Sequence, residues 1–285
     1  MTQLIATPQT QPEGDGADQP GGEEETPRGR EFVSSLERGL KVMQALGDAP
    51  EGLTLTDVAG RIGLTRATAR RFLLTLVELG YVRQERRLFL LTPKVLSLGV
   101  TYLSNRPIWQ TAEPVMRELS RRVNESCSAA VLDGTEVVYV ARVAGKRIMS
   151  VNITIGTRLP ALVTSMGRVL LSNLSPTALH AFLAKAEIER FTQYTVTDRD
   201  ALAAEINKVR TRGYAIVDQE LEVGLRSIAV PLRDRAGRAF AGLNISTQTA
   251  RVSSETLVTD FLPLMREAAR RIGDFYGTQP QASLS

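Results

Sequence analysis

The dipeptide Gly63-Leu64 separates two helical patterns, and it constrains the fold of this 285-residue chain more than any other feature. The first pattern covers residues 53–63. The second begins after Thr65 and ends near Gly80, with threonine and glycine as the expected caps. A link of two residues forces the two helices to turn sharply against each other, which is the helix-turn-helix arrangement.

A further helical pattern precedes this pair, and a hairpin pattern follows it. Residues 34–46 place four apolar side chains about one turn apart, which is the spacing of a buried helix face. These side chains are Leu36, Leu40, Met43 and Leu46. Residues 81–92, YVRQERRLFLLT, are typical of two strands joined by a turn around 84–87. Three helices and a hairpin wing predict a winged helix-turn-helix domain over residues 30–92.

The helix after Gly63-Leu64 has one apolar face and one basic face. The apolar face, expected to pack on the first two helices, consists of Ala69, Phe72, Leu73, Leu76 and Leu79. The opposite side of its N-terminal half carries arginines among small residues, which would let the backbone approach the major groove of DNA. Arginine binds guanine bidentately or clamps phosphate, and threonine hydroxyls suit phosphate oxygens. The residues in question are Thr65, Arg66, Thr68, Arg70 and Arg71.

The distribution of charge supports a nucleic-acid partner. The chain has a formal net charge of +4, yet residues 61–94 alone hold eight basic and two acidic residues. Such a density beside a helical pattern is typical of a DNA-binding surface, with a solvated basic face as the alternative. Residues 1–29 contain six acids and one base, are rich in Gly, Pro, Gln and Glu, and are predicted to be a disordered tail.

The rest of the chain predicts a second domain. Residues 93–110 are helical and well placed to act as a linker helix or to pair with a twin in a dimer. Residues 111–277 contain strand patterns flanked by helices at both ends, which predicts an α+β domain resembling a GAF or PAS fold with a central antiparallel sheet. Residues 278–285 form a tail.

Several kinds of protein are excluded or disfavoured by composition. One cysteine, Cys127, rules out an internal disulfide or a cysteine metal cluster, and we expect it to be a buried apolar thiol. One histidine, His180, leaves little scope for metal or triad chemistry. The chain lacks an apolar run long enough for a transmembrane helix and a signal-peptide pattern at its start. These features predict a cytoplasmic protein that needs no cofactor and is not an enzyme.

Many stretches in order resemble an IclR-type transcriptional regulator. Among them are SLERGLKVMQAL, LTRATARRFLLTLVELGYV, ESCSAAVLDG, RIMSVNITIGTRLPALVTSMGRVLL and DQELEVGLRSIAVPLRDRAGR. The resemblance covers residues 32–277 and favours the branch that controls the β-ketoadipate pathway in response to protocatechuate, para-hydroxybenzoate or pathway acids. It implies a winged helix-turn-helix, a linker helix and an effector domain, in homodimers that often pair into tetramers. The DNA-binding positions that it implies are Thr65, Arg66, Thr68, Arg70, Arg71, Arg83, Arg86 and Arg87.

The resemblance also implies an effector pocket between the central sheet and the loop and helix that follow it. The positions it gives are Met149, Asn152, Arg158, Leu159, Thr164, Ser165, Met166, Asp218, Glu222, Arg226 and Asn244. Arg158 and Arg226 are equally suited to hold a ligand carboxylate or to form ion pairs with Asp218, Glu220 or Glu222. Thr164 and Ser165 could receive an anion or simply cap a helix. Met149 and Met166 could pack on an aromatic ring, although core filling is favoured.

Three functions are consistent with these features, and the sequence favours one of them. A regulator that binds DNA and a small carboxylate effector is favoured, either for aromatic-acid catabolism or for another carbon source. An enzyme tethered to nucleic acid is disfavoured because the sequence lacks a nucleophile–base motif and a phosphate-binding loop. An architectural DNA-binding protein would have no use for a second domain of this size.

Overall fold

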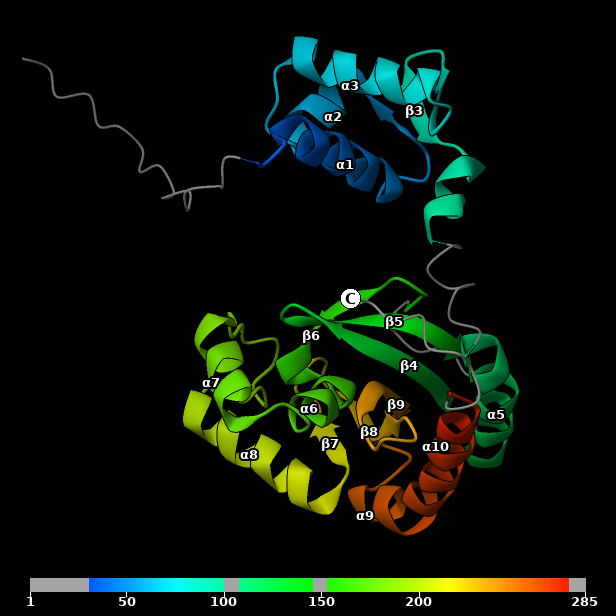
Figure 1. Ribbon diagram of the computed structural model, residues 1–285, viewed down its shortest axis with the longest axis vertical. Helices are drawn as coiled ribbons and strands as arrows, with labels where there is room; N and C mark the ends of the chain where they lie inside the picture. The colour runs from blue at the N-terminus through cyan, green and yellow to red at the C-terminus, as the bar shows by residue number, and fades with distance from the viewer. Residues whose placement is uncertain (1–30, 100–107, 146–152, 277–285) are drawn as a thin grey trace, which may run out of the picture. The chain divides into compact units, whose positions relative to one another are not determined.

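The computed structural model describes residues 31–99, 108–145 and 153–276 (Figure 1). The chain divides into two compact units, Met1–Leu96 and Ser97–Ser285, which are treated separately below. Both predicted tails, residues 100–107 of the predicted linker helix, Met149 and Asn152 lie outside the described residues. The domain boundaries given by the sequence therefore remain predictions.

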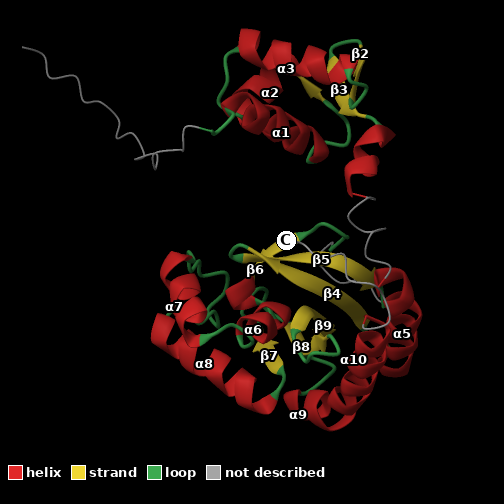
Figure 2. Ribbon diagram, in the orientation of Figure 1, coloured by secondary structure: helices red, strands yellow, loops and turns green. Residues whose placement is uncertain are grey.

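The first unit contains a helix-turn-helix and a small sheet (Figure 2). Its three antiparallel strands have the order β1-β3-β2, so the hairpin β2–β3 gains a third strand from residues just before the second helix. That extra pairing was not predicted from the sequence. The elements are α1 (Ser34–Gly47), β1 (Leu53–Thr54), α2 (Leu55–Arg61), α3 (Arg66–Glu78), β2 (Val82–Glu85) and β3 (Leu88–Leu91).

Local sequence explains where these helices begin and end. The Thr54 hydroxyl accepts the backbone N–H of Asp57, whose carboxylate in turn accepts the backbone N–H of Thr54, so α2 starts with a capping box. The Thr65 hydroxyl accepts the backbone N–H of Thr68 and caps α3. Gly63 has φ +63°, a left-handed conformation that glycine adopts readily and that permits the sharp turn.

Two expectations about the buried faces of these helices were partly wrong. In α1, Leu36 and Leu40 are 64% and 50% exposed, and only the C-terminal half of the helix, through Val42, Ala45 and Leu46, enters the core. In α3, Leu79 is 51% exposed because the helix ends there and its apolar face stops at Leu76. Helical spacing predicts which residues share a face, but the length of the neighbouring elements decides how much of that face is covered.

The second unit is built on a six-stranded antiparallel sheet with the order β6-β5-β4-β9-β8-β7, which confirms the predicted α+β class (Figure 1). The first unit ends just after a short 3-10 turn at Pro93–Val95. In the second unit, helix α5 (Ile108–Val123) precedes the sheet. The strands are β4 (Ser126–Asp133), β5 (Glu136–Val143), β6 (Arg158–Pro160), β7 (Ala215–Asp218), β8 (Leu225–Arg233) and β9 (Ala239–Gln248). The later helices are α6 (Ser165–Leu171), α7 (Pro176–Lys185), α8 (Arg199–Arg212), α9 (Ser254–Thr256) and α10 (Leu262–Tyr276), the last two joined by a π-helical turn at Leu257–Phe261.

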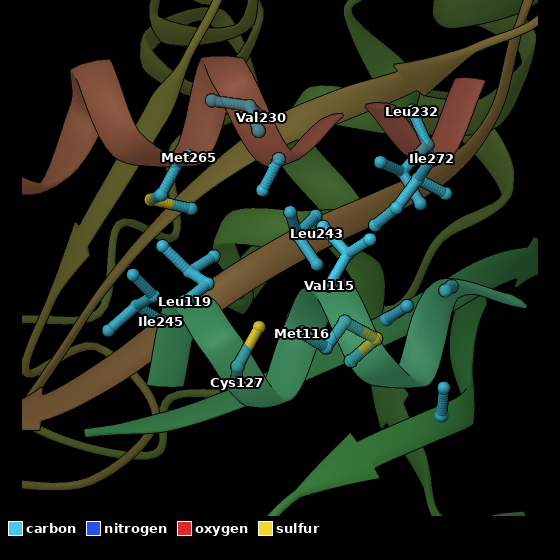
Figure 3. Packing of buried hydrophobic residues seen from close by; sticks show 14 of the residues in the cluster. Val115, Met116, Leu119, Cys127, Val230, Leu232, Leu243, Ile245, Met265 and Ile272 are labelled. Atoms are coloured by element: carbon cyan, nitrogen blue, oxygen red, sulfur yellow. The ribbon is translucent and has the colours of Figure 1, made fainter. Parts of the chain in front are cut away.

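One face of this sheet packs on α5 and α10 (Figure 3). Met116 and Leu119 of α5 and Met265 of α10 meet Leu243 and Ile245 of β9 in a continuous apolar layer. Cys127 is fully buried in the same layer, and burial raises the pKa of its thiol. This confirms the expectation of an apolar structural cysteine.

The opposite face of the sheet carries α6, with α7 and α8 beyond it (Figure 1). All seven residues of α6 are buried. A Cβ on Gly167 would lie 2.0 Å from the Ala161 carbonyl oxygen, and one on Gly242 of β9 would lie 3.0 Å from the Met166 Cβ. Glycine at 242 therefore allows α6 to lie directly against the sheet, and glycine at 167 allows the 3-10 turn Ala161–Val163 to approach α6 closely. We call this surface, where α6 covers the strands, the α6 face.

Candidate functional sites

The exposed side of α3 presents three arginines to solvent. Arg66, Arg70 and Arg71 are all exposed, and none forms an ion pair with a residue that the structure describes. The Thr65 and Thr68 hydroxyls lie 2.9 Å apart beside them at the start of the helix. A recognition helix uses its N-terminal half in the major groove, so uncompensated arginines at this end suit contact with DNA.

The wing adds three more arginines. Arg83 pairs with Glu85 at 2.8 Å, but both side chains are more than half exposed, so a phosphate could replace the carboxylate at little cost. Arg86 occupies the turn with φ +55°, and its carbonyl accepts the Gln84 side-chain amide. Arg87 is exposed next to it. The structure thus places all eight predicted DNA-contacting residues on α3, its cap and the wing.

The α6 face carries a row of polar side chains from three neighbouring strands. Ser128 of β4 lies directly opposite Arg142 of β5 on one side and Asn244 of β9 on the other. Directly opposite residues of antiparallel strands point to the same face. Leu243 and Ile245, which flank Asn244, pack towards α5 and α10, so Asn244 and its row point towards α6. Ser128 and Asn244 are 2% and 4% exposed.

Arg142 was not among the predicted effector residues, yet it is the arginine of this row. It is half-buried, and within the described residues it has neither a hydrogen bond nor an ion pair. Burial lowers the pKa of its guanidinium, while neighbouring Tyr139 opposes that shift. The group still remains a cation at neutral pH because the unperturbed pKa of arginine is so high. A partly desolvated cation without a counter-charge is what a carboxylate ligand would neutralise.

Two further polar atoms of this region are buried without a hydrogen-bond partner among the described residues. They are the Ser165 Oγ, at the start of α6, and the Asn244 Oδ1. The Asn244 amide nitrogen already donates to the Ser246 hydroxyl at 3.1 Å. Buried polar atoms are nearly always satisfied in native proteins, so unpaired ones on the α6 face point to a ligand or to water.

The other residues predicted at the start of α6 have structural contacts. Thr164 caps the helix by accepting the backbone N–H of Gly167 at 3.1 Å, which is the capping alternative. Met166 is fully buried against Gly242, which is the core-filling alternative. Leu159 is partly buried and packs on the same cluster as Met166.

The structure places Arg158 and Arg226 in ion pairs. Arg158 bonds Glu136 at 2.6 Å and Asp133 at 2.8 Å on an edge strand, and the Glu136 hydrogen bond is the main cause that raises the pKa of Arg158. The expectation that Asp218, Glu220 or Glu222 would be its partner was wrong. The sequence did not reveal that β6 pairs with β5, which brings Arg158 beside the β4–β5 turn.

Arg226 pairs with Asp218 at 2.7 Å across β7 and β8 and donates to the Val252 carbonyl at 2.8 Å. Along β7 and β8, the residues next to Asp218 and Arg226 point to the α6 face. The side chains of Asp218 and Arg226 therefore point to the opposite face of the sheet, beside Val252. The structure does not bring them together with Asn244. Glu222 follows in the partly buried loop before β8.

A buried ion pair, which sequence reasoning missed, holds α6 in place. Arg168 and Glu220 are 2% and 7% exposed, with 2.6 Å between Nη2 and Oε2. Arg168 Nε also donates to the Leu162 carbonyl, and Glu220 accepts the backbone N–H of Val196. The only sequence signal was a basic residue inside an otherwise apolar helix. The pair fixes the segment before α6 relative to the end of β7.

A winged helix-turn-helix, together with an α+β domain whose half-buried Arg142 has no partner among the described residues, is typical of a DNA-binding regulator with a ligand-sensing domain. Two family models match in that order: the IclR helix-turn-helix domain over residues 35–86 and the bacterial transcriptional regulator IclR C-terminal domain over residues 100–274. The chain belongs to the IclR family of transcriptional regulators.

Individual relatives agree with this assignment. The chain is 42% identical over 241 residues to the Pca regulon regulatory protein of Pseudomonas putida, covering 84% of this chain and 83% of that protein. A crystal structure of a transcriptional regulator from Rhodococcus sp. RHA1 is 52% identical, with a TM-score of 0.75 over 85% of this chain and 97% of that one. An IclR homologue from Microbacterium hydrocarbonoxydans, crystallised with 4-hydroxybenzoate, is 26% identical, with a TM-score of 0.74 over 84% of this chain and 97% of that one. Within the described residues, no helix is long and apolar enough to cross a membrane.

Proposed function

We propose that this protein controls genes of aromatic-acid catabolism, in the β-ketoadipate pathway, and that its effector is a small aromatic carboxylate such as 4-hydroxybenzoate or protocatechuate. The observation that carries the proposal is the half-buried guanidinium of Arg142, which has no partner among the described residues and stands in a row with Ser128 and Asn244. The name of the Pseudomonas relative and the ligand of the Microbacterium structure support the pathway and the class of effector.

The chemistry of the α6 face suits such a ligand. The planar guanidinium of Arg142 matches the two oxygens of a carboxylate. Buried residues of the cluster on the same face, Tyr139 and Met166, suit an aromatic ring. The Asn244 Oδ1 can accept a hydrogen bond from a phenolic hydroxyl, and the Ser165 hydroxyl can donate or accept one. A ligand with a carboxylate at one end and a hydroxyl at the other would satisfy each of these groups.

The remaining predicted effector residues have a supporting part in this proposal. Leu159, Thr164 and Met166 shape the wall that α6 and its preceding strand form. Arg158 and the Arg226–Asp218 pair hold the sheet edges through their ion pairs rather than binding the carboxylate. The effector thus has one cation, Arg142, as its principal anchor.

The DNA-binding half of the proposal rests on the eight side chains of α3 and the wing. A homodimer would place two recognition helices on half-sites about one helical turn, or a multiple of it, apart. Such a regulator acts in the cytoplasm, where we place this protein. If several of the arginines contact phosphates, log affinity should fall with log salt by about 0.9 for each phosphate neutralised. An operator affinity that is insensitive to salt would contradict this part.

Calorimetric titration of the protein with 4-hydroxybenzoate and 4-hydroxybenzamide tests the effector class. The acid and the amide differ in charge but hardly in shape, so the acid should bind at least about tenfold more tightly if Arg142 recognises a carboxylate. Equal affinities would refute carboxylate recognition. Recovery of the acid unchanged after incubation would support a regulator over an enzyme.

A further inference from the structure

A cavity in the second unit lies on the side of the sheet away from the α6 face. Its volume is about 410 Å³, and it lies between the β8–β9 turn and helix α10. Gly213, at the C-terminal end of α8, closes a third side. The proposed effector function makes no use of this cavity.

The cavity is lined by four arginines and two aspartates, Arg233, Arg235, Arg266, Arg270, Asp234 and Asp274. Arg266 and Arg270 are one helical turn apart on α10, with Ala269 and Gly273 on the same face. A Cβ on Gly273 would lie 2.3 Å from the Arg233 carbonyl oxygen, so glycine allows α10 to approach the end of β8 closely. The small residues leave space between the guanidinium groups.

The two aspartates do not neutralise this arginine cluster. The Asp234 carboxylate is engaged within its own hairpin, accepting the Arg238 backbone N–H at 2.8 Å and bonding the Arg238 guanidinium at 2.8 Å. Desolvation by burial raises the pKa of Asp234, but the hydrogen bonds from Arg238 outweigh that effect and hold the pKa below its usual value. Asp274 pairs with Arg270 at 3.1 Å, and both side chains are at least 65% exposed, so that contact can be exchanged readily.

The other three arginines meet only neutral acceptors or none. Arg233 donates to the Gly237 carbonyl at 2.8 Å, and Arg266 donates to the Arg212 carbonyl at 3.2 Å. Arg235, in the turn, has no hydrogen bond or ion pair with a described residue. Three guanidinium groups around one cavity therefore lack a carboxylate partner in the described parts of the chain. All three are exposed, so an anion with more than one negative charge can reach them from solvent.

We propose that this cavity is a second ligand site, separate from the effector site, that binds a small polyanion with at least two carboxylate or phosphate groups. Arg235 and Arg266 hold one oxyanion group from opposite sides, and Arg270 exchanges Asp274 for the other. Arginine forks bind carboxylate and phosphate bidentately, which gives the site its preference for these groups over chloride.

Titration of the full chain with citrate, pyrophosphate, succinate and acetate at constant ionic strength tests the proposal. Citrate or pyrophosphate should bind and acetate should not. Whichever of the two binds more tightly identifies carboxylate or phosphate as the natural group. The Arg235→Gln/Arg266→Gln variant should lose at least about tenfold in affinity, because two charge-assisted hydrogen bonds to the anion are lost. Arg117→Gln/Arg121→Gln on exposed positions of α5 removes the same charge and should bind as the parent does.

Failure of every polyanion to bind would overturn the proposal, and so would equal losses of anion affinity in both variants. Loss of operator affinity in the Arg235→Gln/Arg266→Gln variant, without a change in anion binding, would also overturn it, because the cluster would then be a DNA contact. Binding of 4-hydroxybenzoate serves as an internal reference. It should be unchanged in the Arg235→Gln/Arg266→Gln variant, so a failure of this second site is distinguishable from a failure of the proposed effector site.

Discussion

The arginines of α3 in the first unit and those around the sheet of the second unit differ in whether they bond a carboxylate. On α3 the side chains of Arg66, Arg70 and Arg71 are exposed and unpaired among the described residues. Around the sheet of the second unit, Arg158, Arg168 and Arg226 each bond a carboxylate. Arg142 resembles the first group in lacking a partner and the second in being partly buried. We infer that Arg158, Arg168 and Arg226 have structural roles, whereas Arg142 and the α3 arginines are available to a ligand and to DNA.

Breaking the buried pair should have the largest effect. Arg168→Ala leaves the Glu220 carboxylate buried without its partner, which should cost about 3–5 kcal/mol in free energy of unfolding. Arg158→Ala removes a half-exposed pair and should cost roughly 1 kcal/mol or less. Urea unfolding of both variants measures the contrast. Similar losses of unfolding free energy in the two variants would mean that the buried pair contributes no more to stability than the half-exposed one.

Removing the unpaired cation of the α6 face should spare the fold and damage ligand binding. Arg142→Gln should lower the affinity for 4-hydroxybenzoate by about 1.5–3 kcal/mol, because a charge-assisted hydrogen bond is lost. Arg158→Gln is the matched control, since it removes a paired arginine from the same sheet. Calorimetric titration of the two variants checks the prediction. Full affinity in Arg142→Gln would place the carboxylate elsewhere.

The unpaired arginines of α3 should govern sequence discrimination. Arg66→Ala or Arg70→Ala should reduce the preference for the operator over a mismatched site by roughly 1–3 kcal/mol if the side chain is bidentate to guanine. Arg86→Ala on the wing should weaken all sequences alike if it contacts only the backbone. Competition binding with operator and mutated duplexes separates the two patterns, and an equal loss on every duplex for the α3 variants would argue against base contacts.

The smallest effect is expected at the helix caps. Thr54→Ala and Thr65→Ala each remove a side-chain acceptor at a helix start and should cost about 1 kcal/mol in free energy of unfolding. Only Thr65→Ala should also weaken operator binding, because Thr65 lies beside the α3 arginines. Comparable DNA affinities for the two variants would limit Thr65 to a structural part.

Local features of the fold could be predicted from the sequence, and features that depend on strand neighbours could not. The cap at Thr65 and the turn at Gly63 depend on a few adjacent residues, so the sequence alone predicted them. The burial of Leu36 was overestimated, since burial depends on which elements reach that end of α1. The α+β class followed from the order of the strand and helix patterns.

The candidate effector site shows the same limit. Arg226 was equally suited to a pocket or an ion pair from sequence, and only the register with β7 gives it Asp218 and the opposite face of the sheet. Arg142 gave a weak signal as the one basic residue in the apolar run VVYVARV. Its importance depends on pairing with Ser128, which lies on another strand and whose register cannot be read from the chain.

Operator binding by the parent and by Arg142→Gln, each with and without 4-hydroxybenzoate, tests the central claim most directly. The claim is that an aromatic carboxylate held by Arg142 controls a DNA-binding regulator. We predict that the ligand changes operator affinity in the parent and leaves it unchanged in Arg142→Gln, while both proteins bind the operator equally without ligand. An identical ligand response in the two proteins, with folding intact, would contradict the account.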